Sequence, residues 1–150
     1  MVKTDFASGK VIKMFMENNL PGGIPLINFG TVDVRDVAQA HINCIESDEA
    51  QGHRHILVNR SLWMREIGEI LRGQFPRYPI PSSEAKYCFI KFAAWFRSDA
   101  AKVAQYWGME RTFDNTRSRN VLGIEYRDMN STIKEMVESM INHGLIAQRQ

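Results

Sequence analysis

Two pairs of residues have the types and spacing that chemistry requires. Tyr87 and Lys91 stand four positions apart in a helix-like stretch, so two side chains of types that can serve as general acids or bases would lie side by side. His53 and His55 alternate to one face of a strand-like stretch, as two metal ligands do, but no third ligand is close in the sequence. Helix neighbours and surface histidines are the simpler explanations. We therefore expect no metal site, and we rank catalysis by Tyr87 and Lys91 last.

A third pair, Asp33 and Asp36, has the residue types of a general acid and a general base. Asp36 is better explained by its place in the first turn of a predicted helix, where the helix dipole favours negative charge. The sequence contains no GxSxG, HExxH or Walker A run. No complete catalytic constellation is therefore visible in this chain.

The composition is typical of one soluble globular domain. The chain has 150 residues, 44% hydrophobic and 24% charged, and its charges are interleaved with a net of +2, which gives no support for nucleic acid as a partner. No apolar run reaches the roughly 18 residues of a membrane span, and charged residues occupy the start of the chain where a signal peptide is apolar. Cys44 and Cys88 form no CxxC pair. We expect core cysteines, a cytoplasmic protein and no membrane partner.

The first part of the chain predicts a helix, short strands and a second helix. Ser8 is a candidate cap for a helix over 9–17, and residues 24–34 are too rich in glycine and proline for a helix. The helix that follows runs to Glu46 and carries one apolar stripe, which predicts a buried face. The stripe consists of Val37, Ala38, His41, Ile42 and Ile45.

The second part predicts a strand and further helices. The alternation over 54–58 predicts a buried strand, and Ser61 could cap a helix that stops at Pro76. Residues 84–106 predict one long helix rich in aromatic residues, which we interpret as core packing or the wall of an apolar pocket rather than a cofactor site. A short strand, a short helix and a last helix are expected over 111–113, 116–122 and 129–143.

The segment from Val32 to His41 resembles the VDVRDVAxAH signature of the extended short-chain dehydrogenase/reductases, in the branch of dihydroflavonol, cinnamoyl-CoA and yeast-type methylglyoxal reductases. Further segments agree with this family in order and spacing, and the match runs along nearly the whole chain. They are Glu46 with Gly52-His53-Arg54-His55-Ile56, then Tyr78-Pro79-Ile80-Pro81, then Asp114-Asn115-Thr116 with Val121-Leu122-Gly123-Ile124, and finally His143-Gly144-Leu145-Ile146.

The resemblance implies an α/β chain that corresponds to the C-terminal part of a Rossmann-type fold, with the last parallel strands and a small helical substrate lobe. It also implies an enzyme that transfers hydride from NADP(H) to a ketone or aldehyde. The family's glycine-rich dinucleotide loop is absent from this chain, and no tyrosine precedes Asp33. We expect a single unit, residues 1–150, that lacks the N-terminal dinucleotide-binding half and does not bind NADP by itself.

By the same resemblance, Ser8 lies where relatives approach the cofactor and Asn28 lies where flavonoid-reducing relatives place a pocket amide. We therefore expect Ser8 to contact the cofactor and Asn28 to contact the small carbonyl substrate. Two other hypotheses remain: a stand-alone, non-catalytic binding or interaction module derived from the family, and a small enzyme that uses Tyr87 and Lys91. A sheet without its first strands exposes an edge, so the isolated chain should be poorly soluble or pair with a partner through that edge.

Overall fold

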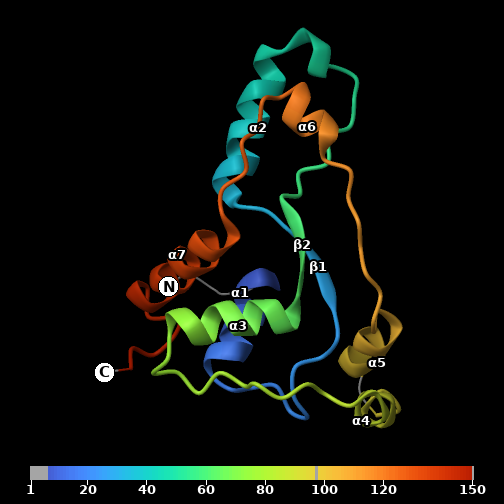
Figure 1. The fold of residues 1–150 in the computed structure, drawn as a ribbon, viewed down its shortest axis with the longest axis vertical. Helices are drawn as coiled ribbons and strands as arrows, with labels where there is room; N and C mark the ends of the chain where they lie inside the picture. The colour runs from blue at the N-terminus through green and yellow to red at the C-terminus, as the bar shows by residue number, and fades with distance from the viewer. Residues whose placement is uncertain (1–6, 97, 150) are drawn as a thin grey trace.

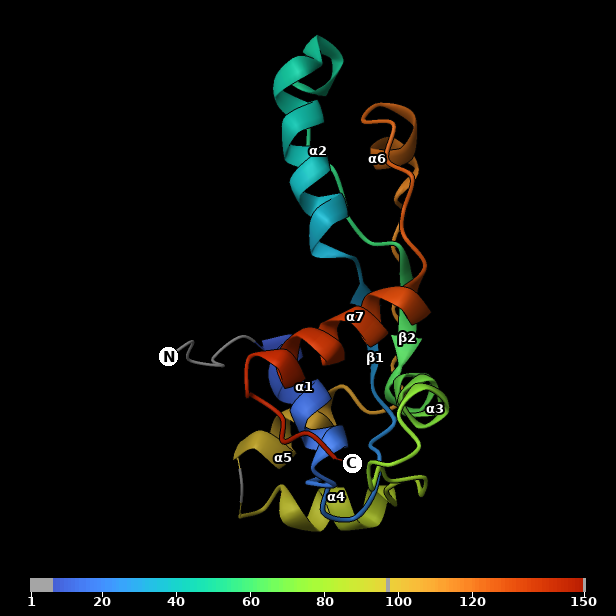
Figure 2. The same ribbon diagram turned by 90° about the vertical axis from the view of Figure 1, so that its left-hand side faces the viewer.

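The computed structural model describes residues 7–96 and 98–149. Its elements in chain order are α1 (Ala7–Met16), β1 (Asn28–Thr31), α2 (Val34–Glu46), the 3₁₀ turn η1 (Asp48–Ala50), β2 (Arg60–Trp63), α3 (Met64–Gln74), α4 (Tyr87–Ala93), α5 (Ser98–Gln105), α6 (Thr116–Asn120) and α7 (Met129–Asn142). The molecule is elongated, with α2 and α6 at one end, α4 and α5 at the other, and α1, α3 and α7 around the strands between them (Figure 1, Figure 2). No helix within the described ranges has the length and apolar character needed to cross a membrane.

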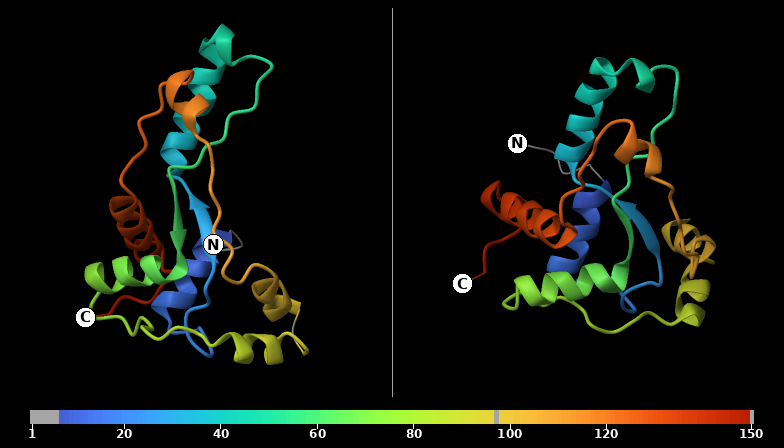
Figure 3. Two further views of the ribbon diagram at one scale, coloured as in Figure 1. Left: turned by 45° about the vertical axis from the view of Figure 1, so that its right-hand side comes forward. Right: turned by 45° about the horizontal axis from the view of Figure 1, so that its top comes forward.

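The two strands form an antiparallel pair, with Asn28 opposite Trp63 and Thr31 opposite Arg60. The expectation of parallel neighbours is wrong for this pair. Between the strands the chain passes through α2 and η1 and then returns, extended, toward the sheet, so β2 enters beside β1 in the opposite direction (Figure 3). The only parallel contact among the described residues is an isolated bridge between Ile24 and Glu84.

The main core lies where α1, α3 and α7 meet the strands. Its fully buried side chains include Phe15 and Met16 of α1, Leu62 of β2, Leu71 of α3 and Val137 of α7. Burying a side chain of this size contributes roughly 1.5–3 kcal/mol to stability. This core fixes α1 and α7 relative to the strands, and thereby shapes the groove described below.

A second, smaller cluster joins α2 and η1 to the segment after α6. Its buried members are Ala40, Ala50, Leu122 and Ile124. The predicted inward stripe of α2 is wrong, because the helix buries Asp36 and Ala40 instead, while Ile42 is 50% and Ile45 82% exposed. The stripe is present in the sequence, but nothing in the described chain covers it.

The predicted strand over 54–58 is also absent from the described structure, and its residues are extended without a strand assignment. The strand lies six residues later, at β2, because Arg60–Trp63 finds a hydrogen-bonding partner in β1 and 54–58 does not. Ser61, expected to cap a helix, lies within β2. The start of α3 is instead closed by Glu66, whose carboxylate accepts a bond of 2.8 Å from the backbone N–H of Trp63.

The aromatic stretch predicted as one helix over 84–106 forms two helices, α4 and α5. Core packing is wrong for most of its aromatic residues, since Phe92 is 64%, Trp95 84% and Phe96 75% exposed. Cys88 is exposed as well, although the sequence suggested a core cysteine. The segment is too short and too rich in apolar residues for the main core to cover all of its faces.

Candidate functional site

A groove of about 920 Å³ lies between α1, α7 and the segment that leads from β1 into α2. Its floor and walls are apolar, and polar side chains occur on the side formed by the start of α2 and the outer turns of α7. The apolar lining includes Val11, Ile12, Phe29, Ile67, Ile133, Met136 and Met140. Mostly apolar walls with a few polar groups are typical of small-molecule sites.

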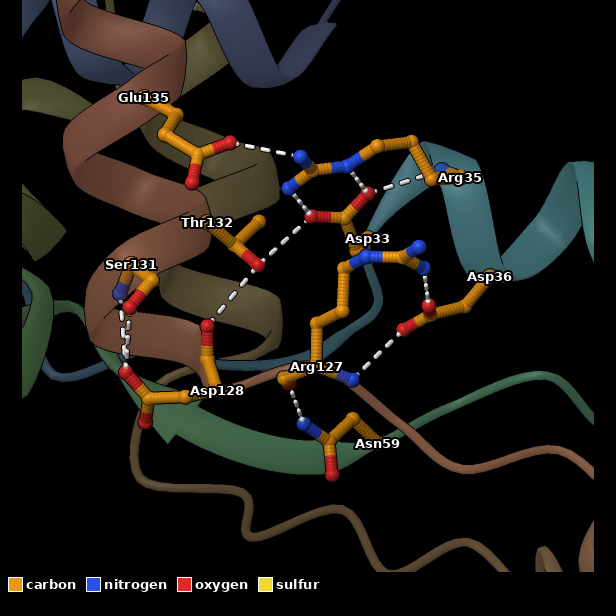
Figure 4. Close-up of polar contacts among 9 residues, drawn as sticks. All are labelled: Asp33, Arg35, Asp36, Asn59, Arg127, Asp128, Ser131, Thr132 and Glu135. Atoms are coloured by element: carbon orange, nitrogen blue, oxygen red, sulfur yellow. Dashed lines mark hydrogen bonds and ion pairs between the residues drawn. The ribbon is translucent and has the colours of Figure 1, made fainter.

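Asp33 organises the polar side of the groove. Its buried carboxylate accepts hydrogen bonds from the backbone N–H of Arg35 at 2.8 Å, from the Arg35 guanidinium at 2.6 and 2.9 Å, and from Thr132 Oγ1 on α7 at 2.8 Å (Figure 4). Arg35 also forms an ion pair of 2.7 Å with Glu135 of α7. The bonds from Arg35 hold the pKa of Asp33 well below its usual range, although burial acts in the opposite direction. Asp33 is therefore an ionised acceptor and not a proton donor at neutral pH.

Asp36 makes a second link between α2 and the segment before α7. Its buried carboxylate pairs with the Arg127 guanidinium and accepts a bond of 3.0 Å from the Arg127 backbone N–H. The Arg127 carbonyl in turn accepts a bond of 2.7 Å from the Asn59 side chain (Figure 4). Asp33 and Asp36 thus hold elements together, and the acid and base interpretation of this pair has no support in the geometry.

Sequence reasoning missed the partners of these two carboxylates. Thr132 and Arg127 lie 99 and 91 residues after Asp33 and Asp36. A threonine and an arginine near a helix start have no distinguishing local pattern, so a single sequence carries no signal for either contact. The acidic pair itself was visible, but the expected role of Asp36 as a charge in the first turn was incomplete.

The two site residues expected from the family lie in different places. Ser8 lines the groove, within α1 rather than in front of it, so its expected role as a helix cap is wrong. Asn28 is buried at the start of β1 and does not line this groove. Its side-chain oxygen accepts a bond of 3.1 Å from the backbone N–H of Arg111. The structure does not bring Ser8 and Asn28 to one cavity.

The remaining candidates lie outside the groove. Tyr87 and Lys91 are both exposed on α4, where the Tyr87 ring packs against Trp107 with centroids 5.4 Å apart. His53 is exposed, while His55 is half-buried with its Nε2 atom 3.2 Å from the carbonyl of Ala50. Within the described part of the chain, no three His, Cys, Asp or Glu residues are grouped so that they could hold a metal ion.

The described starts of α2, α3 and α7 do not fit a dinucleotide phosphate. Such a phosphate binds to free backbone N–H groups at a helix N-terminus, usually after a glycine-rich loop. In this chain Asp33 caps α2, Asp128 caps α7, and Glu66 accepts the bond at the start of α3. These carboxylates occupy the donors and would repel a phosphate. No step of hydride chemistry can be assigned to these helix ends.

Comparisons with known proteins identify the relatives of this fold. The ketoreductase azaE of Aspergillus niger is 33% identical over 126 residues, which are 82% of this chain and 32% of the relative. A putative NADPH-dependent methylglyoxal reductase, GRP2 of Candida albicans, is 30% identical over 73% of this chain and 28% of its own length, and plant cinnamoyl-CoA reductases also match. The solved structure of Candida albicans Gre2 in complex with NADPH has a TM-score of 0.67 and 28% identity, over 94% of this chain and 38% of that chain.

No protein-family model matches the sequence. The chain spans about a third of the length of the curated relatives that it matches. The similarity in sequence and the similarity in fold nevertheless agree on the same group of proteins, and both extend over most of this chain. The chain therefore belongs to the extended short-chain dehydrogenase/reductases with the Rossmann-type α/β fold, in the branch of the Gre2-type methylglyoxal reductases and the cinnamoyl-CoA reductases.

Proposed function

We propose that this chain supplies the substrate-side lobe of an NADPH-dependent carbonyl reductase. The hydride transfer chemistry is then held by a dinucleotide-binding part outside the present sequence. Relatives named as NADPH-dependent reductases support this assignment, as does a neighbour solved with NADPH. The substrate is a small ketone or aldehyde, and the chain alone binds no cofactor.

The uncovered face of α2 is the observation that carries the proposal. Ile42 and Ile45 project from this helix without cover, and the neighbouring segment 54–58 is extended but unpaired within the described chain. The side of α2 that faces the second cluster is filled by Ala40 and Cys44. An apolar helix face beside an unpaired strand-like segment is what remains when the rest of a sheet that both should pack against is missing.

Two residues connect this lobe to the chemistry. Ser8, at the groove between α1 and α7, is proposed to approach the cofactor held by the missing part. Asn28 is proposed to contact the carbonyl substrate through its side-chain amide, while its oxygen remains bonded to the Arg111 backbone. An oriented amide that donates a hydrogen bond to a substrate carbonyl holds that carbonyl in one position and raises the effective concentration of the reacting atoms.

A chimera tests the proposal. This chain replaces the matching part of the Candida albicans NADPH-dependent methylglyoxal reductase, and loss of NADPH absorbance is followed with methylglyoxal as the substrate. We expect the chimera to oxidise NADPH and the isolated chain neither to oxidise it nor to bind it. A folded chimera that binds NADPH but turns over no carbonyl compound would contradict the assignment of the substrate lobe.

Variants of the chimera separate the hypotheses. Asn28→Ala should raise the KM for the carbonyl substrate about tenfold, as the loss of one hydrogen bond implies, and leave the Kd for NADPH unchanged. Asn28→Asp keeps the acceptor for Arg111 and removes the donor, so it should give the same effect without releasing Arg111. The exposed Asn120 provides the matched control, Asn120→Ala. Tyr87→Phe should leave kcat unchanged, whereas a large loss would favour catalysis by Tyr87 and Lys91.

The stand-alone binding module predicts a different result. In that case the isolated chain binds a carbonyl compound by itself, and the chimera has no reductase activity. Equilibrium binding of the isolated chain to methylglyoxal, measured by calorimetry beside the chimera assay, distinguishes the two. Binding by the isolated chain together with an inactive, folded chimera would favour the module.

A further inference from the structure

The outer face of α4 and of the turn after it forms a continuous aromatic surface. We define this aromatic surface by Phe92, Trp95 and Phe96, which are 64%, 84% and 75% exposed. Phe96 packs edge-on against Phe92 with ring centroids 5.5 Å apart and stacks with Trp95 at 6.3 Å. The rings contact one another and leave their outer faces uncovered. Three large exposed rings in one place exceed the scattered apolar residues of an ordinary surface.

Two exposed lysines accompany this surface. Lys91 lies beside Phe92 and Trp95 in a shallow depression on α4, and Lys86 lies exposed in front of the helix. Between Glu84 and Asp99 the sequence has no acidic residue, and Glu84 itself forms an ion pair with Arg65. Aromatic rings beside exposed lysines are typical of helices that lie in the interface of an anionic membrane.

The other face of α4 shows that the helix is anchored to the protein. Ile90 is buried, and the Phe89 ring lies so close to Gly22 that a side chain at residue 22 would meet it at 2.4 Å. Tyr87 packs against Trp107. The helix is therefore held in place by one side, while the rings of the aromatic surface project from the other.

The position of α4 suits a flat partner. It lies at one end of the long axis of the molecule, opposite the end formed by α2 and α6 (Figure 1, Figure 2). A membrane could contact the aromatic surface while the exposed face of α2 remains accessible to the rest of a reductase. Attachment of this kind needs no spanning helix, because the rings enter only the boundary between headgroups and acyl chains.

We propose that the aromatic surface binds the headgroup region of anionic lipid membranes. Phe92, Trp95 and Phe96 insert at the level of the headgroups, and the neighbouring lysines contact lipid phosphates and carboxylates. A second copy of the chain is the less favoured occupant, because a symmetric contact through this surface would bring the basic residues of both copies together. The inference is independent of the proposed reductase function.

Sedimentation with vesicles tests the proposal. The full chain is mixed with phosphatidylcholine vesicles, with or without phosphatidylserine, and the bound fraction and the tryptophan fluorescence are measured. We expect binding and a blue shift only with phosphatidylserine, and weaker binding at high salt. Lys91→Glu should weaken binding at least fivefold, since each basic residue near an anionic surface strengthens binding by about fivefold.

Two variants test whether vesicle binding depends on the aromatic surface or on any exposed apolar side chain. The double variant Trp95→Ala, Phe96→Ala should lose vesicle binding, and its unfolding midpoint should remain that of the original chain because both rings are exposed. Ile45→Ser removes an equally exposed apolar side chain at the other end of the molecule and should bind vesicles as before. Equal loss in Ile45→Ser, or no binding to phosphatidylserine at all, overturns the proposal. The proposal is also overturned if the original chain dimerises with increasing concentration, the double variant does not, and neither binds vesicles.

Discussion

Replacing Asp33 by alanine tests whether the VDVRD segment is a structural link between α2 and α7. The carboxylate caps α2, binds Thr132 of α7 at 2.8 Å and pairs with Arg35. Loss of a helix cap costs about 1 kcal/mol, a hydrogen bond to a charged group about 1.5 kcal/mol, and an ion pair to a half-exposed arginine about 0.5 kcal/mol. We therefore expect Asp33→Ala to lower the free energy of unfolding by about 3 kcal/mol.

Urea denaturation followed by circular dichroism at neutral pH measures this loss. For a chain of this length, a loss of 3 kcal/mol corresponds to a fall of roughly 10 °C in the melting temperature, which thermal denaturation measures. Asp33→Asn keeps one oxygen that can accept the cap bond, but it loses the charge and the second oxygen, which accepts the bond from Thr132, so it should lose about 2 kcal/mol. Asp48→Ala, at an exposed aspartate in η1, is the control. A loss for Asp33→Ala no larger than that of the control would refute the role assigned to Asp33.

Four further changes have defined outcomes. Because the pKa of Asp33 is lowered in the folded state, its contribution to the free energy of unfolding is present above the unfolded pKa of about 4 and is lost as the pH falls below that value. Urea denaturation at a series of pH values should show this decline in stability, and the decline should be smaller in Asp33→Asn. Phe15→Ala, at a fully buried ring, should cost about 3–5 kcal/mol by the same denaturation assay. Gly23→Ala should cost about 2 kcal/mol or more, since Gly23 has a φ of +103° and a Cβ atom would lie 2.8 Å from backbone atoms of Ser83 and Glu84; an unchanged midpoint would contradict this. Ile45→Ser should change the free energy of unfolding by less than about 0.5 kcal/mol and should raise solubility, and a large loss would mean that α2 is covered after all.

The helices α1 and α7 were predictable because each buries its own amphipathic face, whereas α2 was predictable in its bounds although its apolar stripe is uncovered. The helix over 9–17, the helix ending at Glu46 and the last helix over 129–143 match α1, α2 and α7 within a few residues. Their caps were harder to assign. Asp33 and Asp128 cap α2 and α7 by accepting bonds from backbone N–H groups two and three residues further along the chain. Several neighbouring polar residues are equally plausible caps in the sequence.

The strand could not be placed from the sequence because pairing is not a local property. Residues 54–58 have the stronger β-propensity and alternation, yet β2 lies at Arg60–Trp63, where β1 supplies hydrogen bonds. The site had the same limitation. Asp33 and Asp36 stand out by type, but Thr132 and Arg127 become their partners only when α7 folds back onto the start of α2.

The mismatches between sequence and structure occur on two surfaces, and they differ in kind. On α2 and 54–58 the residues have the pattern of buried elements, a helical stripe and a strand alternation, so their sequence is consistent with a larger fold than the described chain contains. On α4 and the turn after it the large exposed apolar residues are aromatic and lie beside Lys86 and Lys91. The proposed missing sheet would explain the first surface, because a sheet needs apolar stripes and alternating strands. It does not explain the second, whose chemistry matches the boundary of a lipid bilayer better than the interior of a protein.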